Sequence, residues 1–159
     1  MPSRPSARAP LALSMGDPAG IGPEVILKAA GAVAARRTAP ALLVIGDAGA
    51  MRAAARRLRD VPEPRPWHPG DAPLRPTDGL AVLEVGRLGH AALRPGTPSV
   101  EGADAAYRYV VEGARMALAG EVAALVTAPI NKAWLNRAAT ASPAIPSCWQ
   151  SSAGRGSGG

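Results

Sequence analysis

The residues best placed to do chemistry form a glycine-rich turn near the start of the chain. Gly16, Gly20 and Gly22 follow the spacing G-x-x-x-G-x-G directly after a short apolar run, and Asp17 and Glu24 supply the carboxylates of the turn. Glycines let a backbone approach a ligand closely, and the free N–H groups at a helix N-terminus attract anions. The spacing matches neither G-x-G-x-x-G nor G-x-x-x-x-G-K-[ST]. The sequence therefore predicts an anion-binding turn, with a purely structural turn between strand and helix as the alternative.

A second polar segment, residues 127–132, directly follows another apolar run. Thr127 offers a hydroxyl, Asn131 an amide and Lys132 an ammonium group, and Lys132 is one of only two lysines in the chain. Beyond a strand end, these groups can gather around a phosphorylated, hydroxylated substrate. The alternative is a solvated helix N-terminus with Asn131 as its cap.

Apolar runs that alternate with segments of helical spacing predict a parallel α/β sheet with right-handed crossovers. Residues 60–78, which hold six prolines, and residues 86–98 are expected to be irregular. In such sheets ligands bind at the carboxyl ends of strands, where both polar segments fall. The expected strands are 11–15, 41–45, 80–85 and 122–126. One expected helix begins at Pro23, and three more cover residues 48–59, 99–119 and 133–138.

The longest expected helix, 99–119, has a regular apolar pattern. Ser99 is expected to cap its start and Gly120 to end it, while Asp47 is expected to cap the helix 48–59. The apolar residues of the long helix recur at steps of three and four, so we expect them to face the sheet. They are Val100, Ala103, Tyr107, Val110, Val111, Ala114 and Leu118.

The composition indicates one globular domain. A chain of 159 residues with 47% apolar residues can bury a core. The net charge of +6 comes from scattered arginines without interleaved aromatics, so nucleic acid is not an expected partner. A membrane is not an expected partner either, because the chain has no apolar run of sufficient length. Cys148 is the only cysteine, which excludes an internal disulfide and a multi-cysteine zinc site and favours a cytoplasmic location. No signal peptide is expected, and no apolar run approaches the ~20 residues of a membrane span.

The exact strings of the two polar segments point to a family. GDPAGIGPE at residues 16–24 resembles the opening loop of the 4-hydroxythreonine-4-phosphate dehydrogenases of pyridoxal phosphate biosynthesis, and is similar to the shorter GDGIGPE loop of isocitrate and isopropylmalate dehydrogenases. TAPINK at residues 127–132, continued by Asn136, resembles a strand-end segment of the same family. The resemblance covers residues 10–137 and implies an incomplete three-layer α/β/α lobe of the isocitrate/isopropylmalate dehydrogenase-like fold. We accordingly expect a disordered segment 1–9, a partial lobe 10–138 and a non-homologous, disordered tail 139–159.

The resemblance also implies an activity. The family oxidises the hydroxyl of 4-(phosphooxy)-L-threonine to a ketone in vitamin B6 synthesis, and the resulting β-keto acid decarboxylates. It implies NAD or NADP and a divalent metal (Zn, Mg or Co) as cofactors, and a homodimer that shares metal ligands across its interface. Asp17 and Glu24 are then expected to orient the loop and helix, and Lys132 to meet the substrate anion, while no catalytic residue is identified.

The resemblance stops after about Arg137, before the family's Gly-His-Thr-Glu segment, its three metal-binding histidines and its nicotinamide loops. Only His68 and His90 remain, and both are expected to be exposed loop residues, so no metal site is expected. Codons that can encode residues 142–150 read Phe-Pro-Gly-His-Thr-Glu-Leu-Leu-Ala when the frame moves back by one base. We therefore expect that a frameshift replaced the family sequence and that this chain alone is inactive. A dehydrogenase of another four-carbon phosphorylated hydroxy acid, or a non-catalytic remnant or dimerisation module, are the alternatives.

Overall fold

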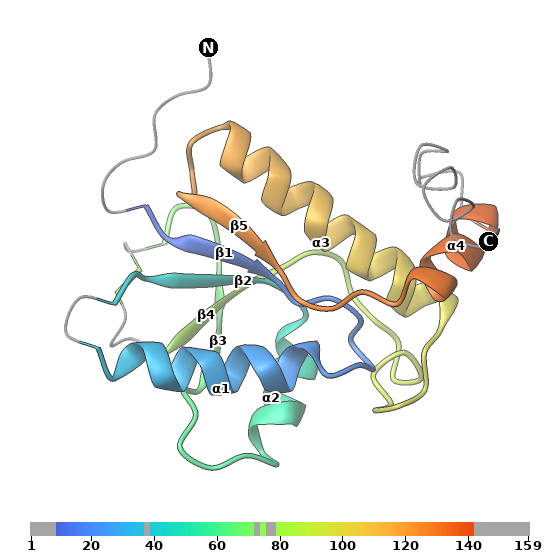
Figure 1. Ribbon diagram of the computed structural model, residues 1–159, viewed down its shortest axis with the longest axis horizontal. Coiled ribbons are helices and arrows are strands. Elements are labelled where there is room, and N and C mark those ends of the chain that lie inside the picture. Colours follow the sequence, from blue (N-terminus) through green and yellow to red (C-terminus); the bar gives the residue numbers. More distant parts are fainter. Residues whose placement is uncertain (1–8, 37–38, 72–73, 76–78, 142–159) are drawn as a thin grey trace, which may run out of the picture.

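The computed structural model describes residues 9–36, 39–71, 74–75 and 79–141, which form a five-stranded sheet with helices on both faces (Figure 1). All strand pairs are parallel, in the order β3-β4-β2-β1-β5. The expected parallel α/β fold is therefore confirmed. In chain order the elements are β1 (Leu11–Ser14), α1 (Gly22–Ala34), β2 (Leu42–Gly46), α2 (Ala48–Ala55), β3 (Pro64–Trp67), β4 (Leu80–Glu84), α3 (Val100–Leu118), β5 (Ala124–Thr127) and α4 (Lys132–Ala141).

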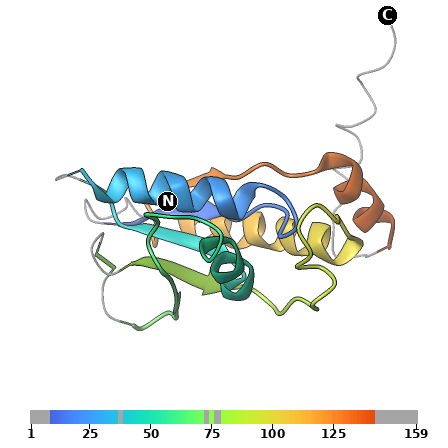
Figure 2. The same ribbon diagram turned by 90° about the horizontal axis from the view of Figure 1, so that it is seen from below.

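The helices divide between the two faces of the sheet. Helices α1 and α2 contact each other on one face, whereas α3 crosses β2, β1 and β5 on the other (Figures 1 and 2). Helix α3 lies so close that a Cβ atom at Gly113 would be 2.6 Å from Leu125 Cδ1 and 3.1 Å from Ile45 Cδ1. The outcome is the three-layer α/β/α arrangement that the sequence predicts.

The centre of the core is β2. Leu43, Val44 and Ile45 are all fully buried, because helices cover both faces of this strand and strands flank both of its edges. A continuous apolar run is typical of such a central parallel strand. The run was the reason for predicting a buried strand here, and that prediction is confirmed.

The predicted helix ends are largely confirmed. Asp47 Oδ1 accepts a hydrogen bond from Ala50 N at 2.7 Å, and Ser99 Oγ accepts one from Gly102 N at 3.0 Å. Gly120 has a φ of 75°, which glycine adopts readily after a helix end, and Glu121 N donates to Met116 O at 2.9 Å. Helix α2, however, ends at Ala55 and not at residue 59.

The segment 60–78 is not wholly irregular, as the sequence analysis expected, because it contains β3. Prolines argue against a central strand, but an edge strand can hold them where its N–H groups would point away from the sheet. β3 is such an edge strand, since it pairs only with β4 among the described residues. The alternation of Pro64 and Pro66 in this strand fits that role.

The prediction of the sheet-facing stripe of α3 was wrong for most of its members. Val111 is 47% and Leu118 71% exposed, while the buried residues include Tyr109 and Met116. Small residues let the helix approach the sheet closely, so the contact stripe contains glycine and alanine in place of the larger aliphatic residues. The buried residues of α3 are Gly102, Ala103, Ala105, Ala106, Tyr109, Gly113 and Met116.

Helix α4 packs against α3 and extends the predicted helix 133–138 to Ala141. Ala103 of α3 forms a small apolar cluster with Leu135 and Ala138 of α4. The tail prediction for residues 142–159 and most of the prediction for residues 1–9 lie outside the described residues. Within the described part of the chain, no helix is long and apolar enough to cross a membrane.

Candidate functional site

The topology changes direction at β1. The chain passes from β1 through α1 to β2 on one side, whereas β5 arrives on the other side of β1 through α3 on the opposite face. Open α/β sheets bind ligands in the crevice outside the carboxyl ends of strands at such a switch point. The two polar segments, 16–24 and 127–132, follow the two strands that flank this crevice.

The structure brings these two segments into direct contact. Ala128 N donates a hydrogen bond to Ser14 O at 3.0 Å. A Cβ atom at Gly16, whose φ is 72°, would lie 2.5 Å from Pro129 O. A Cβ atom at Gly22 would lie 2.1 Å from Met15 O and 3.3 Å from the Cβ atom of Ala128. Two of the three glycines are therefore required where the first segment turns against the second.

Asp17 holds the shape of the first segment. Its side chain is 6% exposed, and Oδ1 accepts a hydrogen bond from Ala19 N at 2.9 Å, while Gly20 N donates to Asp17 O at 3.0 Å. The same carboxylate lies against the first turn of α3, 3.4 Å from where a Cβ atom at Gly102 would be. Through these contacts Asp17 links the turn to the start of α3, and its role in a substrate site stays a prediction.

Glu24 lies in the first turn of α1, on the exposed surface. Its Oε1 accepts a hydrogen bond from Lys28 Nζ at 2.6 Å, and this bond and the lysine charge lower the pKa of the Glu24 carboxyl. The carboxylate therefore pairs with the next turn of its own helix, and not with the second polar segment.

The second segment presents its polar groups to solvent. Asn131 Oδ1 accepts a hydrogen bond from Trp134 N at 3.3 Å, so the oxygen caps α4 while the amide NH₂ can still donate. Thr127 is exposed at the end of β5. Lys132, also exposed, has no hydrogen bond or ion pair with any described residue. Its ammonium group is free to meet an anion beside the N-terminus of α4.

A third loop, which the sequence analysis did not assign to the site, closes over the first segment. Gly96 N donates to Ala19 O at 2.7 Å. This loop, the first segment and α2 surround a hollow of about 480 Å³, whose rim carries Arg57 and Glu24 and whose walls include Ala54 and Leu93. The sequence signal for this loop is its set of turn residues, which do not reveal where the loop docks. They are Gly86, Gly89, Pro95, Gly96 and Pro98.

Ser14, the last residue of β1, is another buried group that the sequence did not single out. Its side chain is fully buried, and its hydroxyl has no hydrogen-bond partner among the described residues. Because Ser14 aligns with Thr127 of β5 and Ile45 of β2, its side chain is on the α3 face of the sheet. The hydroxyl is therefore on the same face of the sheet as the side chains of Ile45 and Thr127.

The described residues do not form a metal site. No group of three His, Cys, Asp or Glu side chains among them could hold a metal ion. His68 and His90 are exposed in separate loops, as the sequence analysis expected.

The sequence of this chain is similar to those of known dehydrogenases. The family model described as pyridoxal phosphate biosynthetic protein PdxA matches residues 38–155. A 4-hydroxythreonine-4-phosphate dehydrogenase from Maricaulis maris is 43% identical over 134 residues, which are 84% of this chain and 39% of that protein. A putative D-threonate 4-phosphate dehydrogenase from Bradyrhizobium diazoefficiens is 40% identical over 131 residues, covering 80% of this chain and 36% of that protein.

Solved structures give the same result. A putative 4-hydroxythreonine-4-phosphate dehydrogenase from Salmonella typhimurium superposes with a TM-score of 0.69 at 31% identity, covering 91% of this chain and 44% of the other. A terephthalate 1,2-cis-dihydrodiol dehydrogenase from Burkholderia xenovorans superposes with a TM-score of 0.63 at 30% identity, covering 80% of this chain and 36% of the other. The chain thus spans about two fifths of the length of the relatives it matches.

Proposed function

Because this chain belongs to the family of the pyridoxal phosphate biosynthetic protein PdxA, we propose that it supplies substrate-binding segments of a 4-hydroxythreonine-4-phosphate dehydrogenase. The observation that carries this proposal is the packing of segment 16–24 on segment 127–132 at the switch point of the sheet. Both segments are the ones whose sequences resemble the family, and ligands of open α/β sheets bind at this position.

The substrate would be a small phosphorylated hydroxy acid. Lys132 lies at the start of α4, and its ammonium group has no partner among the described residues; the helix dipole there also favours an anion. The amide NH₂ of Asn131 and the hydroxyl of Thr127 can hydrogen-bond substrate oxygens. Asp17 and the glycines fix the opposing loop, so their part is positioning and not proton transfer.

The reaction proposed for the complete family fold is oxidation of the substrate hydroxyl with NAD or NADP, assisted by a divalent metal. A bound nicotinamide would supply a hydride acceptor, and a bound divalent metal would supply polarisation of the substrate oxygen. The described residues do not provide three metal ligands, so we do not assign the metal to them. We also propose a homodimer and a cytoplasmic location for the intact enzyme.

A chimeric enzyme tests this proposal. Residues 10–138 of this chain would replace the aligned segment of the Maricaulis maris relative, and NADH formation would be followed with 4-(phosphooxy)-L-threonine. We expect turnover by the chimera and none by the 159-residue chain alone. A folded chimera without turnover, or turnover by the chain alone, would contradict the proposal.

The second candidate is dehydrogenation of D-threonate 4-phosphate. It is favoured by the relative from Bradyrhizobium diazoefficiens, which bears that putative activity and is 40% identical to this chain over 131 residues. Both substrates have a phosphate and a hydroxyl, but 4-(phosphooxy)-L-threonine has an amino group where D-threonate 4-phosphate has a second hydroxyl. Comparing kcat/KM of the chimera with that of the parent enzyme on both substrates would show whether segments of this chain shift the preference.

We also propose that the frame of the gene changes near the codon for Arg137. Sequencing the coding DNA for residues 136–150 tests this directly. An extra or missing base relative to the present reading would restore the Gly-His-Thr-Glu segment and support the proposal. If none of the reading frames encodes the family sequence beyond this point, the proposal is contradicted.

A further inference from the structure

Loop 86–98 is tied to the first turn of α3. Glu101 Oε1 accepts a hydrogen bond from Gly89 N at 2.7 Å. The helix start does not need this carboxylate, because Ser99 Oγ already caps it by accepting a hydrogen bond from Gly102 N at 3.0 Å. The bond of Glu101 therefore fixes the loop and is not part of the helix cap.

The same loop contacts segment 16–24. Gly96 N donates to Ala19 O at 2.7 Å, and Ala19 N in turn donates to Asp17 Oδ1 at 2.9 Å. Ala19 is 3% exposed, so this contact is buried. The loop is thus bonded to a residue inside the turn that Asp17 shapes.

Between these two contacts the loop is bonded to itself. Ala92 N donates to Gly89 O at 3.0 Å, and Thr97 N donates to Arg94 O at 3.2 Å. Ala92 is also 1% exposed, so the middle of the loop is anchored by packing. Because such hydrogen-bonded turns restrict the backbone, we expect the position of Gly96 to depend on that of Gly89.

We propose that Glu101 is a positioning residue for the substrate site. It holds Gly89, the bonded turns of the loop carry that restraint to Gly96, and Gly96 holds Ala19. Glu101 lies in α3 and outside both polar segments, so it acts through the loop and not on the substrate. This inference rests on the proposed function in one respect, namely that segment 16–24 binds substrate.

The restraint has a consequence for substrate binding. Loss of the Glu101 bond allows the loop to separate from Ala19 more often. Segment 16–24 then occupies more conformations, and the bound substrate must order it. Because this ordering weakens binding of the substrate and of the transition state alike, KM rises while kcat stays nearly constant.

Amide hydrogen exchange of the 159-residue chain, followed by mass spectrometry, tests the restraint. Glu101→Ala is expected to speed exchange in residues 86–98 and 16–24 by about 3–10-fold, the factor that one hydrogen bond contributes, and to leave β2 unchanged. Glu101→Gln keeps an oxygen that can accept from Gly89 N, so it should retain slow exchange. The control Glu112→Ala removes another carboxylate of α3, which bonds Arg115, and should change neither region.

The consequence for binding is measured in the chimera with the Maricaulis maris relative. Glu101→Ala is expected to raise KM for the phosphorylated substrate about 3–10-fold with kcat within about twofold, whereas Glu101→Gln should match the unmodified chimera. Unchanged exchange of segment 16–24 in Glu101→Ala, equally fast exchange in Glu101→Gln, or a lower kcat without a higher KM would overturn the inference. A chimera without turnover in any form contradicts the proposed function, and the exchange experiment then decides by itself whether Glu101 positions the segment.

Discussion

The carbonyl oxygen of Pro129 lies 2.5 Å from the position that a Cβ atom at Gly16 would occupy. Real Cβ atoms do not come this close to a carbonyl oxygen, so the two polar segments can meet only because residue 16 is glycine. The φ of 72° at Gly16 requires glycine for a second, independent reason. The close approach of the two segments thus depends on glycine at position 16, as it also does at Gly22, where a Cβ atom would lie 3.3 Å from the Cβ atom of Ala128.

Replacement of this glycine is the first prediction. Gly16→Ala is expected to lower the free energy of unfolding by about 2–4 kcal/mol, because it adds a steric clash to the strained φ. Urea denaturation followed by circular dichroism measures this. The control Gly96→Ala has a φ of 73° with no atom within 4 Å of the added Cβ, so it should cost only about 1 kcal/mol. Equal losses for both variants would show that the contact with Pro129 is not tight.

Tyr109 is expected to make the free energy of unfolding depend on pH in the alkaline range. This residue of α3 is 1% exposed, and burial, followed by the charge of Asp47, raises the pKa of its phenol well above the ordinary value of 10. A raised pKa means that the folded state favours the neutral phenol. Its contribution to stability is therefore complete below pH 10 and is lost as the pH rises above 10, by up to about 1.4 kcal/mol per pH unit.

Tyr109→Phe is expected to remove this alkaline loss. The measurement is the free energy of unfolding in urea at pH 8, 10 and 11, for which the variant should give a flatter profile. Tyr107→Phe, at a half-buried tyrosine of the same helix, is measured beside it to show whether the other phenol of this helix contributes to the profile. A profile that Tyr109→Phe leaves unchanged would assign the alkaline dependence to other groups.

The elements that the sequence predicted well are those with a strong local signal. The run at Leu43–Ile45 identified the central strand, and Asp47 and Ser99 identified helix starts because their side chains accept hydrogen bonds from the first turns of their own helices. The segments 16–24 and 127–132 could be placed at the same end of the sheet from strand order in the chain alone. Their actual contact needed the coordinates of Gly16 and Pro129.

The failures have tertiary causes. β3 was missed because its prolines are tolerated only at an edge, and nothing in residues 60–78 says which strand ends the sheet. The stripe of α3 was misassigned because Gly113 and its small neighbours, and not Val111 and Leu118, meet the sheet. Docking of the loop at Gly96 on Ala19 likewise depends on a backbone hydrogen bond that carries no residue preference.

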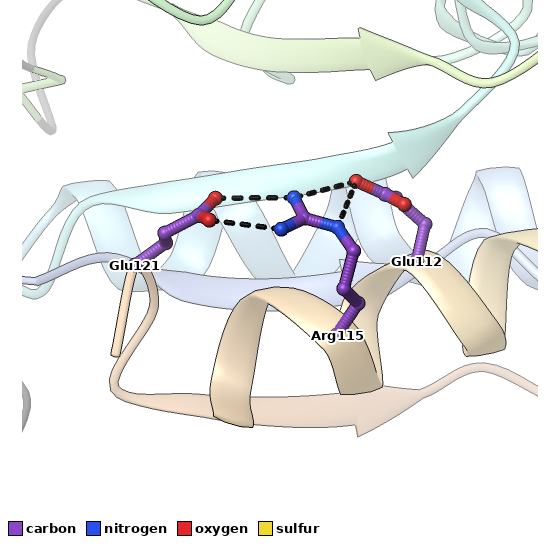
Figure 3. Close-up of polar contacts among 3 residues, drawn as sticks. All are labelled: Glu112, Arg115 and Glu121. Atoms are coloured by element: carbon purple, nitrogen blue, oxygen red, sulfur yellow. Dashed lines mark hydrogen bonds and ion pairs between the residues drawn. The ribbon is translucent and has the colours of Figure 1, made fainter. Parts of the chain in front are cut away.

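An exposed arginine joins α3 to the turn before β5 (Figure 3). Arg115 donates to Glu112 Oε1 from Nε at 3.0 Å and from Nη2 at 2.8 Å, and to Glu121 Oε1 from Nη1 at 2.9 Å. These bonds raise the pKa of the guanidinium further above its ordinary value. Because Glu121 lies beyond the helix, these bonds connect the last turns of α3 to the turn before β5.

Arg115→Met is expected to lower the melting temperature slightly at low ionic strength. The difference from the unmodified chain should shrink in about 1 M NaCl, where the Debye length is roughly 3 Å. Differential scanning fluorimetry at both salt concentrations measures it. Arg59→Met, at an exposed arginine outside this cluster, should leave the melting temperature nearly unchanged at both. A loss for Arg115→Met that salt does not reduce would indicate lost packing and not lost charge.

Lys132 provides the sharpest test of the proposed substrate site. In the chimera with the Maricaulis maris relative, Lys132→Ala is expected to lower kcat/KM for the phosphorylated substrate by about 10–100-fold, since a charge-assisted hydrogen bond contributes about 1.5–3 kcal/mol. The unfolding free energy should not change, because Lys132 is exposed and has no bond to a described residue. Lys28→Ala removes the other lysine, which pairs with Glu24, and should leave kcat/KM within about twofold. Equal kinetics for the two variants would mean that Lys132 is a solvated helix residue and that the substrate phosphate binds elsewhere.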